Sequence, residues 1–269
     1  MNYRKHFCIE PHRKVDLSKW DPADTLDLKD KQKAKALLKK TLPKLSDLQY
    51  RLYTEHKRAV LIVLQAMDAG GKDGTIRHVM GPLNPQGCRV TSFKVPTEEE
   101  RAHDFLWRIH KAVPRRGEIG IFNRSHYEDV LVVRVHNLAP KKIWSKRYKQ
   151  INNFEKHLAA NDVHILKFYL HISKDEQLER FKARIEDPRK HWKVNPQDFA
   201  ERKYWDDYMT AFEQALETCS TSYAPWYIIP ANKKWFRNAA ISQILLETLE
   251  SFDMKYPPAS CDISKIKVE

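Results

Sequence analysis

The stretch from Val60 to Ile76 constrains this chain more than any other part of its sequence. It begins with Val-Leu-Ile-Val-Leu, a run of five apolar residues. The run is rich in β-branched side chains and too short for a buried helix, so it predicts a central parallel strand. It leads into Gly70-Gly71-Lys72 and then into a predicted helix. Strand, glycine turn, lysine and helix form the layout of a phosphate-binding loop, in which backbone N–H groups and the helix dipole attract an anion.

The match of this stretch to the phosphate-loop pattern G-x-x-x-x-G-K-[ST] is incomplete. Ala66 stands where the first glycine belongs, Asp73 stands where the hydroxyl residue belongs, and Thr75 lies two residues late. A tight turn whose glycines only serve packing is therefore the alternative. We expect a phosphate-binding loop whose lysine faces the anion. Its expected binding residues are Ala69, Gly70, Gly71, Lys72, Asp73, Gly74 and Thr75.

The charge of the chain predicts the kind of partner. Its 48 lysines and arginines exceed its 35 acidic residues, which gives a net charge of +13. A polyanionic partner is the natural inference, and a basic surface that only confers solubility is the alternative. The four cysteines lie far apart, the N-terminus lacks the apolar stretch of a signal peptide, and no apolar run approaches the roughly 18 residues of a membrane span. We therefore expect a cytoplasmic protein with no membrane partner.

Short apolar segments alternate with helical patterns along the whole chain. This alternation predicts an α/β fold in which a five-stranded parallel sheet is wrapped by helices on both faces. We expect a single domain over residues 1–269, with an irregular arm at residues 1–28. The ligand of such a sheet lies at the carboxyl ends of its strands. The predicted strands are residues 60–64, 89–93, 119–122, 163–170 and 226–229.

Several residues predict where helices begin, end or bend. Pro43 is expected to kink or restart an amphipathic helix that includes Leu38 and Leu52. Capping boxes at residues 97–100 and 173–176 each predict a helix start, and the first of these helices is expected to continue to Pro114. Asn232 is expected to cap the last helix of the chain.

The loops after the first and third predicted strands hold most of the suggestive polar residues. In the first, Asp68 is a hard oxygen ligand suited to magnesium, and a turn-stabilising aspartate is the alternative. In the second, Asn123 stands where a magnesium-binding carboxylate is usually sought. Asparagine supplies no charge, so the metal candidates there become Glu128 and Asp129, with Asp129 favoured.

Two further residues of the second loop have expected roles. Arg124 is expected to neutralise the oxygens of a transferring phosphoryl group, with a structural salt bridge as the alternative. His126 is expected to be a partly buried, hydrogen-bonded histidine, because phosphoryl transfer needs positioning and charge more than a base. Asn123 and Glu128 are counted among the candidates for phosphate or nucleotide binding.

A basic stretch follows the fourth predicted strand and its helix. A charge run is usually a solvated face. At this position, however, related nucleotide kinases carry a mobile lid, which excludes water and brings in cations as it closes. We expect residues 180–200 to form such a lid and to bind a polyanion. The candidate residues are Arg180, Arg184, Arg189, Lys190 and Lys193.

Three segments together resemble the polyphosphate kinase 2 family. They are Gln-Ala-Met-Asp-Ala-Gly-Gly-Lys-Asp-Gly-Thr at residues 65–75, Phe-Asn-Arg-Ser-His-Tyr-Glu-Asp at residues 122–129 and Tyr-Ala-Pro-Trp at residues 223–226. The resemblance extends from about residue 29 to residue 249. It implies a P-loop kinase core similar to that of thymidylate kinase, with a helical lid, a requirement for Mg²⁺, and phosphoryl transfer between inorganic polyphosphate and a nucleotide.

The resemblance also implies roles for residues at matching positions. Asp68 and Asp129 would serve magnesium, whereas Lys72, Arg124, Arg180 and Arg184 would serve phosphates. Other members carry aspartate where this chain has Asn123. The sequence is similar to the subgroup that phosphorylates both nucleoside mono- and diphosphates. The implied partners are therefore AMP, ADP and ATP, with guanine nucleotides as further candidates, and the implied assembly is a homo-oligomer.

Two other functions are compatible with parts of the sequence. An ATP-dependent nucleotide kinase would share the phosphate loop but has no use for so large an excess of positive charge. A basic nucleic-acid-binding protein would interleave aromatic and basic residues on one face. The tryptophans and tyrosines here are instead scattered among apolar positions, so no nucleic-acid partner is expected.

Overall fold

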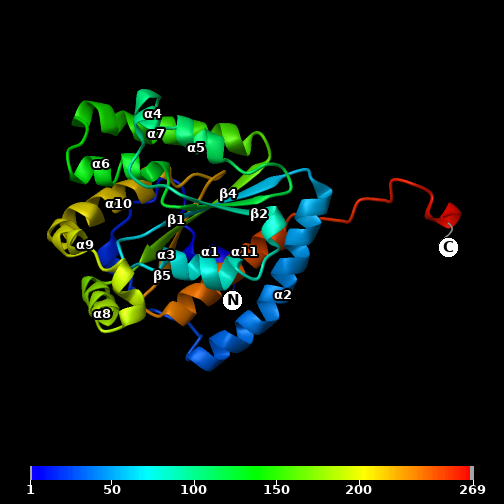
Figure 1. Ribbon diagram of the computed structural model, residues 1–269, viewed down its shortest axis with the longest axis horizontal. Coiled ribbons are helices and arrows are strands. Elements are labelled where there is room, and N and C mark those ends of the chain that lie inside the picture. Colours follow the sequence, from blue (N-terminus) through cyan, green and yellow to red (C-terminus); the bar gives the residue numbers. More distant parts are fainter. Residues whose placement is uncertain (1, 267–269) are drawn as a thin grey trace.

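The computed structural model describes residues 2–266, and it contains the predicted five-stranded parallel sheet. The strands lie in the order β2-β3-β1-β4-β5, and every neighbouring pair is parallel (Figure 1). All five predicted strands are confirmed, each within a residue or so of its expected ends. Their bounds are Ala59–Gln65 for β1, Cys88–Ser92 for β2, Ile119–Asn123 for β3, Val163–His171 for β4 and Trp226–Pro230 for β5.

Strand β1 is central because it is apolar on both faces. All seven of its residues are buried, which only a strand covered from both sides can satisfy. It pairs with β3, where Leu64 lies beside Asn123, and with β4, where Gln65 lies beside Tyr169. The carboxyl ends of these strands therefore meet at one edge of the sheet.

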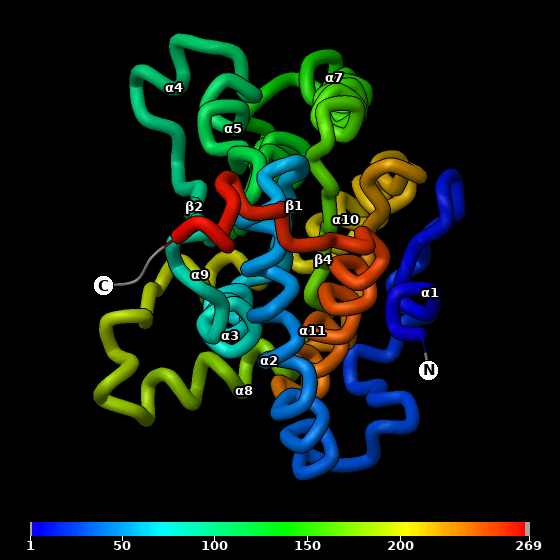
Figure 2. The backbone as a smooth tube through the Cα atoms, turned by 90° about the vertical axis from the view of Figure 1, so that its right-hand side faces the viewer, coloured from blue at the N-terminus to red at the C-terminus, as the bar shows by residue number. Residues whose placement is uncertain are grey.

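Helices cover both faces of the sheet (Figure 1). One face carries α5 (Trp107–Ala112), α7 (Lys141–Ala159) and α10 (Trp205–Cys219), and the other carries α1 (Tyr3–Phe7), α2 (Lys31–Glu55) and α11 (Lys234–Glu250). Helices α2 and α11 lie side by side (Figure 2). The shorter helices are α3 (Lys72–Thr75), α4 (Glu98–Ala102), α6 (Val132–Val135), α8 (Lys174–Ile185) and α9 (Pro196–Ala200).

Two sequence-based expectations about helices were wrong. A third, that Pro43 kinks or restarts its helix, is excluded only for the restart, because Pro43 lies inside the continuous helix α2 packed along α11. The capping box at Thr97 is present, but its helix ends at Ala102 because the Asp104 carboxylate accepts a hydrogen bond from the N–H of Leu106 and forms a turn. Asn232 does not cap α11. Its side chain instead joins Ser173, and so links the start of α8 to the end of β5.

The amino-terminal arm lies against the outer strand β5. Phe7 and Ile9 are buried, and the N–H of Ile9 donates to the carbonyl of Trp226 at 2.8 Å. The arm contains the short helix α1 and a 3-10 turn at Leu17–Lys19, and most of its remaining residues are irregular. Among residues 2–266, none of the helices combines the length and apolarity needed to cross a membrane.

Candidate active site

A cavity of about 1430 Å³ opens where the carboxyl ends of the central strands meet. Its walls come from the loop after β1, the loop after β3, the segment from α8 to α9, and the first turn of α11. Twelve lysines and arginines line it, against four aspartates. Such an excess of one charge sign in a concave site attracts and concentrates anions. The basic members are Lys31, Lys72, Arg77, Lys94, Arg124, Arg180, Arg184, Arg189, Lys190, Lys193, Lys234 and Arg237.

The loop after β1 has the backbone shape of a phosphate loop despite its incomplete sequence match. Ala69 and Gly71 both have positive φ, at 59° and 108°. At Gly71 a Cβ atom would also lie 1.8 Å from Nη1 of Arg237, so only glycine fits there. Helix α3 then begins at Lys72. The loop residues 69–74 line the cavity.

Lys72 lies at the mouth of this loop. Its ammonium group donates to the carbonyl of Ala66 at 3.0 Å. Burial and the neighbouring Arg124 guanidinium lower the pKa of Lys72 to about 8. A cation whose charge is destabilised in the unliganded protein is strongly stabilised when an anion binds beside it.

Arg124 is held beside Lys72 by two carboxylates. Its Nη2 lies 2.8 Å from Oδ1 of Asp68, and its Nη1 lies 3.6 Å from Oε2 of Glu128. The backbone of Arg124 is left-handed, with φ 63°, which costs a side-chain-bearing residue about 1 kcal/mol or more. The surrounding structure must therefore fix this conformation.

A fully buried polar network beneath the loop supplies that rigidity. Oε1 of Glu155 on α7 accepts from the hydroxyl of Tyr127 at 2.8 Å and lies 3.1 Å from Nε2 of His126. Lys167 on β4 donates to Oε2 of Glu155 at 2.6 Å and to the Tyr127 hydroxyl at 2.8 Å. Burial lowers the pKa of His126. The prediction of a hydrogen-bonded histidine at this position is confirmed, and the burial is complete.

Arg180 is not a free lid cation, contrary to the sequence-based expectation. It is buried, and its guanidinium donates to Oε1 of Glu176 and to the carbonyls of Ala69, Gly70, Ala231 and Asn232. These bonds use all five of its N–H groups. Arg180 thus joins the phosphate loop to the end of β5, and the prediction missed this because the acceptors are backbone atoms distant in sequence.

The segment after α8 contacts the phosphate loop through an ion pair. Lys193 lies 3.0 Å from Asp73, and the same carboxylate accepts from the amide of Asn123 at 3.0 Å. Although burial opposes the shift, these two partners lower the pKa of Asp73. Arg184 lies 3.3 Å from Asp198. The predicted cations of this segment therefore face the cavity, with Arg189 and Lys190 at its rim beside Asp187.

Oxygen ligands for a metal ion are present in the cavity, but they are few. Asp68, Asp73, Asn123 and Asp198 line it. Among residues 2–266, no group of three or more histidine, cysteine, aspartate or glutamate side chains is arranged to hold a metal ion. Burial and the nearby Asp68 raise the pKa of Asp198, as expected for two carboxylates that face each other.

Three predicted site residues lie away from the cavity. Asp129 pairs with Arg147 of α7 at 2.8 Å, and burial raises its pKa to about 6. It is therefore placed to anchor α7 rather than to face a ligand. Thr75 is buried, and its hydroxyl donates to the carbonyl of Gly71. Glu128 reaches the site only through Arg124. These three are absent from the cavity lining, whereas the other fourteen candidate residues line it.

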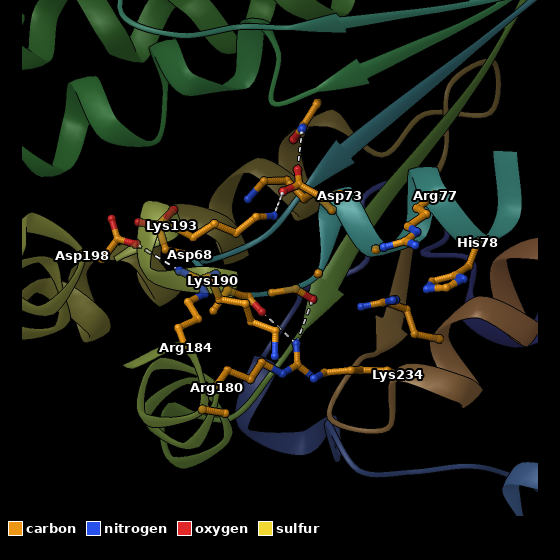
Figure 3. A pocket seen from close by; sticks show the side chains of 18 of the residues that line it. Asp68, Asp73, Arg77, His78, Arg180, Arg184, Lys190, Lys193, Asp198 and Lys234 are labelled. Atoms are coloured by element: carbon orange, nitrogen blue, oxygen red, sulfur yellow. Dashed lines mark hydrogen bonds and ion pairs between the residues drawn. The ribbon is translucent and has the colours of Figure 1, made fainter. Parts of the chain in front are cut away.

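Sequence reasoning missed the contribution of the last helix and of the helix after the phosphate loop. Arg77 and His78 extend the basic wall from the phosphate-loop side, and Lys234 and Arg237 extend it from α11 (Figure 3). A signal existed for α11, because it begins directly after β5 and its first turn is basic, so the rule that ligands lie at strand ends applies to it too. Asp198 carried no such signal, because only the chain reversal after α8 brings it to Arg184.

Comparisons with known proteins identify relatives of the whole chain. The sequence profile of the family described as Polyphosphate kinase 2 matches residues 27–257. The AMP/ADP-polyphosphate phosphotransferase of Meiothermus ruber is 52% identical over 98% of this chain and 100% of its own length. The ADP-polyphosphate phosphotransferase of Rhodopseudomonas palustris is 48% identical over 94% of this chain and 92% of its own. The crystal structure of Polyphosphate Kinase 2 from Arthrobacter aurescens TC1 matches with a TM-score of 0.95 at 43% identity, covering 98% of this chain and 94% of that one.

Proposed function

The chain belongs to the polyphosphate kinase 2 family, and we propose that it transfers a phosphoryl group between inorganic polyphosphate and AMP or ADP. The observation that carries the proposal is the strongly basic cavity built around the phosphate loop. Polyphosphate has roughly one negative charge per phosphate unit, so its binding releases counterions much as nucleic-acid binding does. A lining of many cations is the design that such a donor requires.

Two of the carboxylates that line the cavity lie together at one of its ends, which supports separate places for the two substrates. Arg77, His78 and Lys234 gather at one end (Figure 3). Asp68 and Asp198 lie at the other end, near Lys193. We assign the basic end to polyphosphate, and we propose that Arg184 and Lys193 contact the same chain when the segment at residues 180–200 closes. The end that contains carboxylates suits the nucleotide, because a metal ion can offset the repulsion between these carboxylates and its phosphates.

Phosphoryl transfer asks the protein to position its substrates and to stabilise charge. Lys72 and Arg124 stand side by side at the phosphate loop and are the cations proposed to stabilise the transferring group. The attacking phosphate oxygen of AMP or ADP is already ionised, so no general base is needed. This agrees with the placement of His126 in the loop after β3, where it is buried and bonded to Glu155.

We propose Mg²⁺ as the metal ion. Hard cations of this size prefer oxygen ligands and usually bind through one or two carboxylates plus substrate phosphates and water. The cavity fits that arrangement, because Asp68 and Asn123 lie on adjacent loops and a complete protein cage is not required. When bound, the ion would neutralise charge on the phosphates. Asp68 would serve this role, and it would release Arg124 from their ion pair as the metal ion arrives.

The segment at residues 180–200 is proposed to close over the bound substrates. Its ion pair with the phosphate loop, Lys193 to Asp73, and its internal ion pair, Arg184 to Asp198, are both partly exposed. Such pairs contribute about 0–1 kcal/mol each, so phosphates can displace them. Arg180 would stay in place while the rest of the segment moves, because its guanidinium donates hydrogen bonds to carbonyls of the phosphate loop and of the residues directly after β5.

An assay without ATP tests the reaction. The purified protein is incubated with polyphosphate, Mg²⁺ and ADP, and ATP formation is measured, followed by the same test with AMP, GMP and GDP. We expect ADP and AMP to be phosphorylated, and we propose guanine nucleotides as further acceptors. If the protein works only when ATP is supplied as donor, it is an ordinary nucleotide kinase.

The proposal also covers the oligomeric state of the protein, its location in the cell and its lack of binding to oligonucleotides. We propose a homo-oligomer, which size-exclusion chromatography with light scattering tests. We propose a cytoplasmic location, where nucleotide substrates are abundant, and cell fractionation tests it. Oligonucleotides are not proposed as ligands. They should compete poorly with polyphosphate at moderate salt, since base stacking on exposed aromatic side chains is the usual requirement.

A further inference from the structure

Two buried arginines flank the phosphate loop, and their surroundings are opposite. Arg180 is 7% exposed, and a carboxylate and four carbonyls accept from all of its N–H groups. Arg237 of α11 is 2% exposed. Within residues 2–266, its side chain donates only to Oδ1 of its neighbour Asn238, from Nε at 3.1 Å and from Nη2 at 2.8 Å. No carboxylate of the described chain forms an ion pair with Arg237, and the charged side chain that acts on its pKa is the like charge of Arg180.

An unpaired buried guanidinium is unfavourable for the folded protein. Removing a cation from water costs several kcal/mol unless a partner offsets the loss. Burial and Arg180 accordingly lower the pKa of Arg237 to about 9. A side chain that only filled space at this position would be more stable as an apolar residue, so residues 2–266 leave this charge without a partner.

The phosphate loop is shaped around this guanidinium. A Cβ atom at Gly71 would lie 1.8 Å from its Nη1, and a Cβ atom at Gly74 would lie 3.0 Å from its Nη2. Both glycines and Arg237 line the cavity. The loop therefore admits Arg237 at the point where backbone N–H groups are available to an anion.

We propose that Arg237 is a further binding residue, which holds a phosphate group of inorganic polyphosphate at the phosphate loop. The proposal rests on the proposed function. Polyphosphate is preferred over the nucleotide as its source because Arg77, which follows α3, and Lys234 of α11 continue the cationic wall away from Asp68. Phosphate oxygens would accept from Nη1, which has no acceptor among residues 2–266, and would supply the missing charge.

The two arginines give matched variants with opposite expectations. Arg180→Met removes a satisfied hydrogen-bonding centre and leaves buried carbonyls without donors, so the melting temperature should fall. Arg237→Met removes an unpaired buried charge, so the melting temperature of the ligand-free protein should rise, by roughly 3 °C or more. A purely structural role for Arg237 predicts a fall in both variants.

Binding measurements complete the test, with tripolyphosphate and ADP as separate probes. Isothermal titration calorimetry should show tripolyphosphate binding at least ~10-fold weaker in Arg237→Met, with a flatter salt dependence, whereas ADP affinity stays unchanged. Arg237→Lys keeps the charge and should retain part of the tripolyphosphate affinity without raising the melting temperature.

The possible failures are distinguishable. Equal tripolyphosphate affinity in wild type and Arg237→Met, a fall in melting temperature, or a loss of ADP affinity in place of tripolyphosphate affinity overturns the assignment of Arg237. A wild-type protein that binds no tripolyphosphate and transfers no phosphoryl group from polyphosphate contradicts the proposed function itself, and with it this assignment.

Discussion

Replacing Lys72 by methionine should separate catalysis from folding. The pKa of Lys72 falls from 10.5 to about 8 in the folded protein. At ~1.4 kcal/mol per pKa unit, this shift corresponds to about 3 kcal/mol of unfavourable charge burial. Methionine keeps the hydrocarbon part of the side chain and removes that charge. The unliganded Lys72→Met variant should therefore be at least as stable as the wild type at pH 7.

The turnover rate of the Lys72→Met variant should fall, although its stability should not. A preorganised cation aimed at developing charge contributes roughly 100-fold or more to the rate, which is about 3 kcal/mol of transition-state stabilisation. Initial rates of ATP formation from ADP and polyphosphate should fall by at least ~100-fold in Lys72→Met. Lys57→Met, at an exposed lysine outside the cavity lining, is the matched control and should keep both rate and stability.

The pH dependence of the wild type provides a second measurement of the same charge. Lys72 is charged below its folded pKa of about 8 and neutral above it. Because kcat/KM reports the free enzyme, it should fall as the pH rises through about 8. Lys72→Arg stays charged over this range, so this alkaline fall should disappear from its residual activity. A folded Lys72→Met variant with near-normal turnover would refute the reasoning.

Three further perturbations test other parts of the site. Asp68→Asn should raise the Mg²⁺ concentration needed for half-maximal rate, whereas Asp129→Asn should leave it unchanged. The reverse result would indicate that Asp129, the residue favoured from the sequence, binds the metal ion. Replacing Arg184 and Lys193 together by alanine should weaken polyphosphate binding and lower its salt slope by about 0.7–0.9 for each phosphate that is no longer neutralised, and unchanged binding would reduce the segment to a solvated face. Lys167→Met leaves a buried carboxylate without its ammonium partner, so the free energy of unfolding should drop by about 3–5 kcal/mol, and denaturant titration that shows no such drop would contradict the role of the network.

The parts of the fold that follow from local sequence signals were predictable. The strands are short apolar runs, and a run such as residues 60–64 is typical of a strand at the centre of a sheet, where both faces are buried. Because ligands lie at the carboxyl ends of parallel strands, the sequence also predicted that Asp68, Lys72, Asn123 and Arg124 meet at one edge. Their shared place in the cavity is confirmed.

The errors concern residues whose partners are distant in the sequence. Asp129 was the favoured metal candidate because Asn123 supplies no charge, but Arg147 of α7 forms an ion pair with it. Arg180 looked like a lid cation, but backbone carbonyls from two other loops accept its N–H groups. A sequence pattern gives the type and spacing of side chains. It does not tell which backbone atoms will contact a given side chain in the folded protein.

Arg237 is a residue that the sequence analysis did not select and that the structure singles out. Its position on a helix after a strand could be read from the sequence, but its lack of an acidic partner could not. Only the packed structure shows that the glycines of the phosphate loop make room for its guanidinium. Sequence analysis therefore located most of the residues that line the cavity, and the burial and pairing of each charge indicate which of them we propose as ligand-binding residues.

The most direct test of the central claim compares the two candidate donors on one acceptor. AMP and Mg²⁺ are held constant, and ADP formation is measured with polyphosphate alone and with ATP alone as donor. The basic cavity predicts rapid transfer from polyphosphate without any ATP, with a rate that falls as salt screens the cationic wall. Transfer from ATP alone, together with no transfer from polyphosphate, would contradict the account.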